Sequence, residues 1–98
     1  MDFEIYTETG GARIGMWNAS WPFATLTVSI DRLTLDCFGN SYSFSKEQIS
    51  SITKFRGLFS LGIQINSDSE KMPIPLVFWS LRFACLRKNL EMRGFSID

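Results

Sequence analysis

The sequence predicts a mainly β fold, a barrel of about seven short antiparallel strands followed by one C-terminal α-helix. Apolar and polar residues alternate with a period of two in several short segments, and turn residues separate these segments. After residue 80 the apolar spacing changes to that of a helix. The 98 residues are expected to form a single domain, residues 1–98, because a chain of this length builds one hydrophobic core.

The first twenty residues carry the weakest pattern. Residues 3–7 are predicted to form a strand, and Gly10 with Gly11 a turn. Residues 12–17 fit either a strand loosened by glycine or a bent loop, and both alternatives stay open.

The clearest strand covers residues 23–30, where every second residue is apolar: Ala24, Leu26, Val28 and Ile30. Residues 31–32 are predicted to form a tight turn, which makes residues 33–37 the antiparallel partner. A second turn at residues 39–40 precedes a short strand at residues 42–44. Because these connections are local, the strands form a meander.

A helical turn and two further strands follow. Ser45 and Gln48 have the spacing of a capping box, which predicts one helical turn. The next strand runs from about residue 51 to Arg56, and residues 57–61 interrupt the pattern. Apolar alternation at residues 63–65 indicates another strand.

Proline defines the last predicted strand, residues 74–79, which follows a polar turn at residues 67–71. Because Pro73 and Pro75 lack the N–H that a ladder needs, this strand is predicted to lie at a sheet edge. A helix is then predicted over residues 80–93, with Ser80 as its N-cap and Gly94 at the C′ position.

Composition removes several classes of function. Ten Lys and Arg balance ten Asp and Glu without a block of like charge, so no nucleic-acid partner is expected. The chain has no His, which is the commonest general base and metal ligand. Cys37 and Cys85 lack a CxxC spacing, and no carboxylates are spaced as a catalytic pair. We therefore expect no metal, no cofactor and no enzyme activity.

The cysteines also bear on the compartment. The expected state is a pair of buried thiols, and a disulfide between Cys37 and Cys85 is the alternative for an exported protein. The chain begins without a basic leader, and no apolar segment reaches the roughly 18 residues of a membrane span. A cytoplasmic protein is expected, attached to the inner face of the membrane if it binds lipid.

Five core and turn segments carry a family resemblance: SWPFATL (residues 20–26), RLTL (32–35), YSFSKEQI (42–49), GIQI (62–65) and FW (78–79). In order and spacing they resemble bacterial pleckstrin-homology-like (PH-like) domains of the GRAM type. The resemblance covers most of the chain, from about Ser20 to Gly94. It implies a PH-like barrel capped by the C-terminal helix.

The resemblance also implies binding rather than catalysis. Eukaryotic relatives bind phosphoinositide headgroups, peptides or proteins, and the inositide-binding members clamp phosphates with a basic motif in the first hairpin. In the corresponding stretch, residues 7–14, Arg13 stands alone, beside Glu4 and Glu8. Tight inositide binding is therefore disfavoured.

The most suggestive surface combines charge with apolar residues. Lys54 and Arg56, two positions apart on one strand face, fit a phosphate or an acidic peptide, and a solvated strand face is the alternative. Leu58, Phe59 and Leu61 flank the following turn and fit a membrane or a partner. Packing over the barrel mouth is their alternative.

Trp17 is a further candidate, because large aromatic side chains anchor interfaces as well as cores. The leading hypothesis is a non-catalytic PH/GRAM-like binding or adaptor domain for an unknown protein or peptide partner, held by strand addition or by an aromatic anchor. The alternatives are peripheral association with an anionic membrane surface through Lys54 and Arg56, and formation of a homodimer.

Overall fold

The computed structural model describes residues 5–57, 61–67 and 75–98. The strands of these ranges are β1 (Tyr6–Ile14), β2 (Trp17–Val28), β3 (Arg32–Cys37), β4 (Asn40–Ser45), β5 (Ile49–Arg56), β6 (Leu61–Ser67) and β7 (Leu76–Ser80). A single 3-10 turn, η1 (Lys46–Gln48), connects β4 to β5, and one helix, α1 (Phe83–Met92), follows β7.

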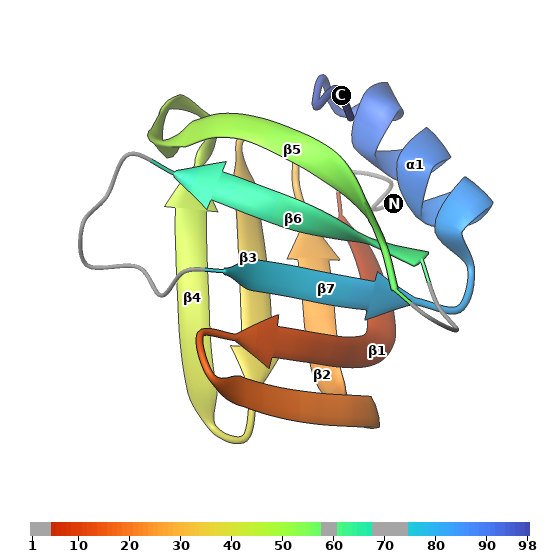
Figure 1. The fold of residues 1–98 in the computed structure, drawn as a ribbon. Coiled ribbons are helices and arrows are strands. Elements are labelled where there is room, and N and C mark those ends of the chain that lie inside the picture. The colour runs from red at the N-terminus through yellow and green to blue at the C-terminus, as the bar shows by residue number, and fades with distance from the viewer. Residues whose placement is uncertain (1–4, 58–60, 68–74) are drawn as a thin grey trace.

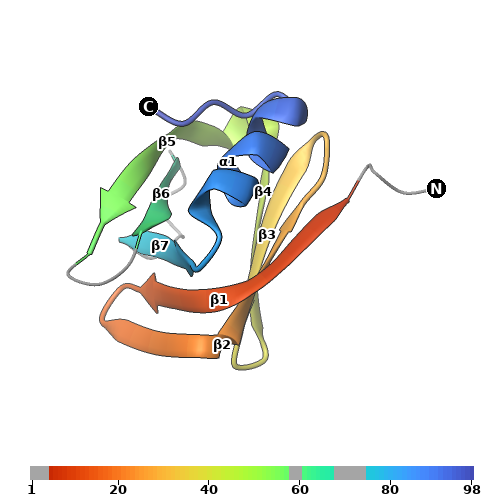
Figure 2. The same cartoon turned by 90° about the vertical axis from the view of Figure 1, so that its right-hand side faces the viewer.

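The seven strands form one antiparallel sheet in the order β4-β3-β2-β1-β7-β6-β5. The sheet curls into an incomplete barrel, and α1 lies at one open end of it (Figure 1, Figure 2). Strands that follow each other in sequence are neighbours from β1 to β4 and from β5 to β7, as short connections favour. The predicted fold class is therefore confirmed: a mainly β, PH-like barrel with a C-terminal helix.

β1 joins the two halves of the sheet. Its residues 6–10 pair with β2, residues 12–14 pair with both β2 and β7, and Gly11 pairs with Trp79 of β7. The predicted turn at Gly10 and Gly11 is wrong, because both residues lie within β1. A Cβ atom at Gly10 would lie 2.7 Å from the Phe78 ring and would also meet the Trp79 carbonyl oxygen. Glycine is required there by close packing and not by a turn.

The β1–β2 turn lies further along the chain, where Gly15 has a φ of +61°. Residues 12–14 continue β1 and Trp17 begins β2. The strand alternative for residues 12–17 is thus the correct one, and it is interrupted by the turn at residues 15–16.

β2 carries a large bulge opposite the glycines of β1. The single residue Gly11 faces residues 20–23 of β2, where the pairing of the two strands shifts. The peptide bond between Trp21 and Pro22 in this bulge is cis. The bulge leaves Trp21 and Phe23 exposed on the outside of the barrel.

β7 is a central strand, contrary to the prediction of an edge. It lies between β1 and β6, and Leu76, Val77 and Phe78 are buried. Pro75 precedes the strand, so its missing N–H removes no bond from the ladder, while its carbonyl accepts a hydrogen bond of 2.8 Å from the Gly15 N–H. The edges of the sheet are β4 and β5.

α1 begins later than predicted. Its N-cap is Arg82 rather than Ser80, and its first helical residue is Phe83. The Ser80 hydroxyl accepts a bond of 3.0 Å from the Arg82 N–H and donates to the Glu8 carboxylate, so Ser80 fixes the joint between β7 and α1. At the other end Gly94 has a φ of +87°, as predicted for C′.

β1 ends at Ile14, seven residues beyond the predicted end of the first strand, and β2 begins at Trp17, six residues before the predicted start of the second. The predicted boundaries of β3 to β7 hold to within two residues. The capping box forms, and the Ser45 N–H donates to Gln48 Oε1 at 2.9 Å. The β3–β4 turn lies at residues 38–39, one residue earlier than predicted. Of the predicted turn at residues 67–71 the structure describes Ser67, the last residue of β6.

The core fills the curl of the sheet and the inner side of α1. Strand alternation accounts for much of it, because these residues predicted to face inward are fully buried: Ala24, Leu26, Val28, Leu33 and Leu35. The prediction is wrong for Ile30, which is 57% exposed because β2 ends at Val28. Phe44, Phe78, Leu86 and Leu90 complete it from other elements. Each such side chain contributes roughly 1.5–3 kcal/mol by leaving water.

Candidate functional site

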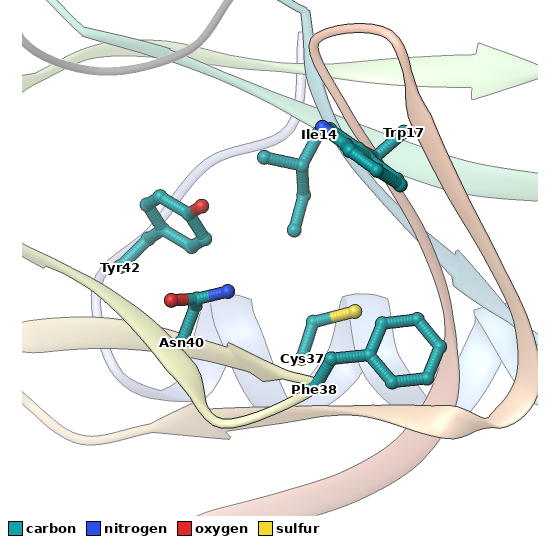
Figure 3. A pocket seen from close by; sticks show the side chains of 6 residues that line it. All are labelled: Ile14, Trp17, Cys37, Phe38, Asn40 and Tyr42. Atoms are coloured by element: carbon teal, nitrogen blue, oxygen red, sulfur yellow. The ribbon is translucent and has the colours of Figure 1, made fainter.

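An apolar pocket of about 350 Å³ opens at the end of the barrel that lies away from α1 (Figure 3). Two turns that Figure 1 places opposite the helix, the β1–β2 turn and the β3–β4 turn, supply its walls. The volume falls in the range of ligand pockets, roughly 300–1,000 Å³. The lining residues are Ile14, Trp17, Cys37, Phe38, Asn40 and Tyr42.

Tight turns position these walls. Ile14 and Trp17 are opposite each other across the β1–β2 turn, so their side chains share one face of the sheet. Cys37 is paired in the same way with Asn40 across the β3–β4 turn. Phe38 has a φ of +50° and the following glycine a φ of +81°, the two left-handed conformations that a type I′ hairpin turn requires.

Phe38 is unusual at this turn position. A left-handed conformation costs a residue with a side chain roughly 1–2 kcal/mol, and hairpin turns of this type prefer Asn, Asp or Gly there. The Phe38 side chain is nevertheless 67% exposed, and its ring stacks on the ring of Phe23 with 5.6 Å between centroids. Local strain combined with an exposed aromatic ring is typical of a functional position rather than of a packing requirement.

Exposed aromatic side chains form the rim of the pocket. Trp17 is 80% exposed and stands opposite Phe38, and Phe23 extends the apolar surface from Phe38 toward the bulge of β2. A contiguous aromatic surface beside an apolar pocket marks an interaction site more often than scattered apolar residues do.

The lining of the pocket is uncharged and mainly apolar. Burial raises the pKa of the Cys37 thiol, so the protonated form is favoured at neutral pH. Asn40 and Tyr42 supply neutral polar groups, and none of the six lining residues is charged. The pocket therefore suits an uncharged, mainly apolar group. No disulfide joins Cys37 and Cys85; Cys37 is buried as predicted, whereas Cys85 is half-buried, contrary to the prediction of two buried thiols.

Among the predicted site residues that the structure describes, Trp17 is the one that lines the pocket. Arg13 is exposed beside the same turn, and its Nε donates to the Gly15 carbonyl at 3.4 Å. Leu58 and Phe59 lie outside the described residues.

The predicted basic pair lies elsewhere. Lys54 and Arg56 are both exposed on β5. The Lys54 ammonium lies 5.1 Å from the centroid of the Phe83 ring in α1, a cation–π contact at the helix end of the barrel. Leu61 begins β6 opposite Arg56 and is half-buried. The structure therefore does not bring this pair together with Trp17.

A buried polar cluster where β1 meets α1 was missed by the sequence reasoning. The Glu8 carboxylate is 6% exposed and accepts bonds from the Ser80 hydroxyl and, at 2.7 Å, from the Tyr6 hydroxyl. Burial, followed by the bond to Glu8, raises the pKa of Tyr6. The Tyr6 hydroxyl also lies 3.6 Å from Cys85 Sγ. The cluster connects β1, β7 and α1, and its satisfied hydrogen bonds offset the cost of burying a carboxylate.

The five pocket residues other than Trp17 were also missed: Ile14, Cys37, Phe38, Asn40 and Tyr42. One available signal was the pair Phe38–Gly39, which places a large apolar side chain where a two-residue turn normally carries a polar one. The rest of the pocket depends on two turns meeting in space.

Comparison of the chain with family models, curated proteins and solved structures finds no significant match. Within residues 5–57, 61–67 and 75–98, no cluster of three or more His, Cys, Asp or Glu side chains is arranged to hold a metal ion. The helix in these ranges lacks the length and hydropathy needed to cross a bilayer.

Proposed function

We propose that this protein is a non-catalytic binding or adaptor domain of the PH-like, GRAM type, which recognises a protein or peptide partner through the pocket at the barrel end. The observation that carries the proposal is the position of Trp17. Its indole is 80% exposed and borders an apolar pocket of about 350 Å³. Such a side chain adds little to the core of its own domain and is available to a partner.

The energetics of recognition favour this surface. Aromatic residues dominate binding hot spots, where truncation to alanine typically costs about 2 kcal/mol or more. A pocket beside the anchor lets a partner side chain become buried at the same time, and apolar burial contributes about 25 cal/mol per Å². The uncharged lining gives no reason for strong dependence on salt.

Two kinds of observation support the family assignment within this proposal. The five segments that resemble GRAM-type domains lie in β2, β3, β4 with η1, β6 and β7. The strand order and the helix at the open barrel end agree with a PH-like architecture. The absence of His from the sequence and the protonated Cys37 thiol support a binding role over catalysis.

Photo-crosslinking from the pocket rim tests the proposal. Benzoylphenylalanine is introduced at position 17 and, as a matched control, at position 92, where Met92 is exposed on α1 at the other end of the barrel. We expect covalent adducts with a defined protein from position 17 and not from position 92. The purified partner should then bind Trp17→Ala at least tenfold more weakly than the unaltered protein.

Two results would contradict the proposal. A partner that crosslinks equally from both positions, or that binds Trp17→Ala with unchanged affinity, does not use this pocket. Binding of the domain to anionic liposomes, without any protein adduct from position 17, would instead favour the membrane alternative.

A further inference from the structure

The two edges of the sheet differ in how they are protected. Unpaired edge strands expose main-chain N–H and C=O groups to other chains, and proteins guard them with charge, proline, bulges or covering segments. Two features protect the β5 edge from pairing with another chain. It carries Lys54 and Arg56, and Asp98 pairs with it through bonds from its N–H to the Ile52 carbonyl at 2.8 Å and from the Lys54 N–H to its carbonyl at 3.4 Å.

The β4 edge has none of these protections in the described structure. Its six residues include no charged residue and no proline, and its pairing with β3 is regular from Cys37–Asn40 to Arg32–Ser45. Within residues 5–57, 61–67 and 75–98, β3 is its strand partner and β4 ends the sheet. An uncharged edge of this length is a template for strand pairing.

The register identifies which groups of β4 face outward. In a two-residue hairpin the pair next to the turn is hydrogen-bonded, and such pairs then alternate along the ladder with pairs that are not. The main-chain groups of Ser41 and Ser43 consequently point away from β3. Their hydroxyls are engaged with β3, since the Ser41 hydroxyl donates to Asp36 and the Ser43 hydroxyl lies 3.2 Å from the Thr34 hydroxyl.

The same strand forms one wall of the pocket. Asn40 and Tyr42 of β4 line it (Figure 3). Phe44, two residues after Tyr42 and therefore on the same face, is fully buried in the core. Because opposite residues of neighbouring strands share a face, a strand added to β4 would direct every second side chain toward this pocket.

We infer that the free edge of β4 and the adjoining pocket together bind an extended segment of another protein, which adds as an eighth strand and places one large, uncharged apolar side chain between Trp17 and Phe38. This inference rests on the proposed function and specifies its ligand. Main-chain bonds to Ser41 and Ser43 supply affinity, and the pocket supplies side-chain selectivity.

A second copy of the chain fits this site poorly. In a symmetric β4–β4 pair, each copy would present the inner face of β4 to the pocket of the other. Phe44 is fully buried in its own core and Tyr42 packs against that core, so neither side chain is free to enter a neighbouring pocket. The uncharged lining also disfavours an acidic or basic segment, because no described lining group would neutralise its charge.

The test is selection of a random dodecapeptide phage library on the full chain, followed by anisotropy measurements with the enriched peptides. We expect sequences with apolar residues at alternate positions and one aromatic or branched aliphatic side chain. Ser43→Pro removes an outward N–H while leaving the β3–β4 ladder intact, and should raise Kd at least fivefold. Ser43→Ala retains the N–H and should change Kd less than twofold.

Each outcome separates the inference from the function on which it rests. If Trp17→Ala weakens binding and Ser43→Pro does not, strand addition is wrong and the pocket function stands. If neither substitution weakens binding, or if no apolar pattern is enriched, both fail. A concentration-dependent dimer that Ser43→Pro dissociates would make a second copy the occupant and overturn the inference. Should Ser43→Pro unfold, as thermal melting would reveal, Ser41→Lys/Ser43→Lys blocks the same edge by charge.

Discussion

The ammonium group of Lys46 donates a hydrogen bond of 2.8 Å to the main-chain carbonyl of Arg93, 47 residues away in the sequence. The same ammonium lies 4.7 Å from the centroid of the Phe95 ring. Arg93 is the C-cap of α1, so Lys46 places positive charge at the carbonyl end of the helix dipole. Through Lys46, η1, which connects the two edge strands β4 and β5, contacts the C-terminal end of α1.

Replacing Lys46 by methionine keeps most of the stem and removes the charge and the donor. We expect Lys46→Met to lower the free energy of unfolding by about 1–2 kcal/mol, because a helix carbonyl loses its partner. Urea denaturation measures the change. Lys88→Met, at an exposed position within α1, is the matched control and should change stability by less than about 0.5 kcal/mol. Equal losses from the two variants would show that the contact with Arg93 contributes nothing.

The Tyr6–Glu8 bond predicts a pH-dependent contribution to stability. The pKa of Tyr6 is raised in the fold above the ordinary tyrosine value of about 10. Its contribution is therefore complete below the pKa of the unfolded chain and declines as pH rises above that value. Tyr6→Phe should cost about 1 kcal/mol at pH 7, and the difference from wild type should shrink as the pH passes 10. A difference that stays constant between pH 7 and pH 10.5 in urea titrations would refute this prediction.

Two glycines should respond differently to alanine. A Cβ atom at Gly10 meets the Phe78 ring and the Trp79 backbone, so Gly10→Ala should prevent β7 from pairing closely with β1 and cost more than about 3 kcal/mol. Gly39 has a φ of +81° with open space around it. Gly39→Ala should therefore lower the free energy of unfolding by about 1 kcal/mol, because only the left-handed backbone conformation is disfavoured. Thermal melting ranks the two, and the reverse order would contradict the role assigned to Gly10.

The reactivity of the Cys37 thiol reports on the burial of the pocket lining. In a Cys85→Ser background, iodoacetamide should modify Cys37 more than tenfold more slowly in the folded protein than in urea, because burial both shields the thiol and raises its pKa. The folded rate should still be rising with pH after the rate in urea has levelled off. Rates measured by mass spectrometry that match in the two states would place Cys37 in solvent instead.

Liposome co-sedimentation tests the membrane alternative. Lys54 is held against the Phe83 ring, and the pocket at the opposite end is uncharged. We expect binding to anionic vesicles to stay at the level of neutral vesicles at both low and moderate salt. Salt-sensitive binding that Lys54→Ala/Arg56→Ala abolishes, and that Lys88→Ala leaves intact, would establish the membrane function in place of the pocket.

Local pattern sufficed for most elements and failed where a residue has two structural uses. The period-two alternation in β2 and β3 predicted that Leu26 and Leu35 belong to the core, because alternate side chains of any strand point to the same face of the sheet. Glycine occurs both in turns and where two segments pack closely, and the sequence does not distinguish these cases. Gly10 is required for close packing, because a side chain there would collide with Phe78, 68 residues away in the sequence. The predicted strand at residues 74–79 includes Pro75, whose missing N–H indicated a sheet edge. In the structure β7 begins one residue later, at Leu76, so Pro75 does not interrupt its pairing and the strand is central.

The site was less accessible from sequence than the fold. Trp17 was identified because a tryptophan next to a turn is notable by itself. The pocket beside it exists because the β1–β2 turn and the β3–β4 turn meet at one end of the barrel, and no local pattern encodes that meeting. No local pattern marks Glu8 as buried, because its partner Ser80 lies 72 residues away in the sequence.

The double pairing of β1 also constrains the order in which the chain acquires its structure. The ladder from β1 to β4 joins neighbouring segments, but Gly11 pairs with Trp79, so the second half of β1 has no partner on its other side until β7 exists. During synthesis the first four strands therefore leave the ribosome as an open sheet whose apolar inner face is exposed to solvent. Closure waits for the last quarter of the chain, and such non-local closure is intrinsically slow. A product truncated before β7 would expose the core face of the meander and aggregate rather than persist as a smaller domain.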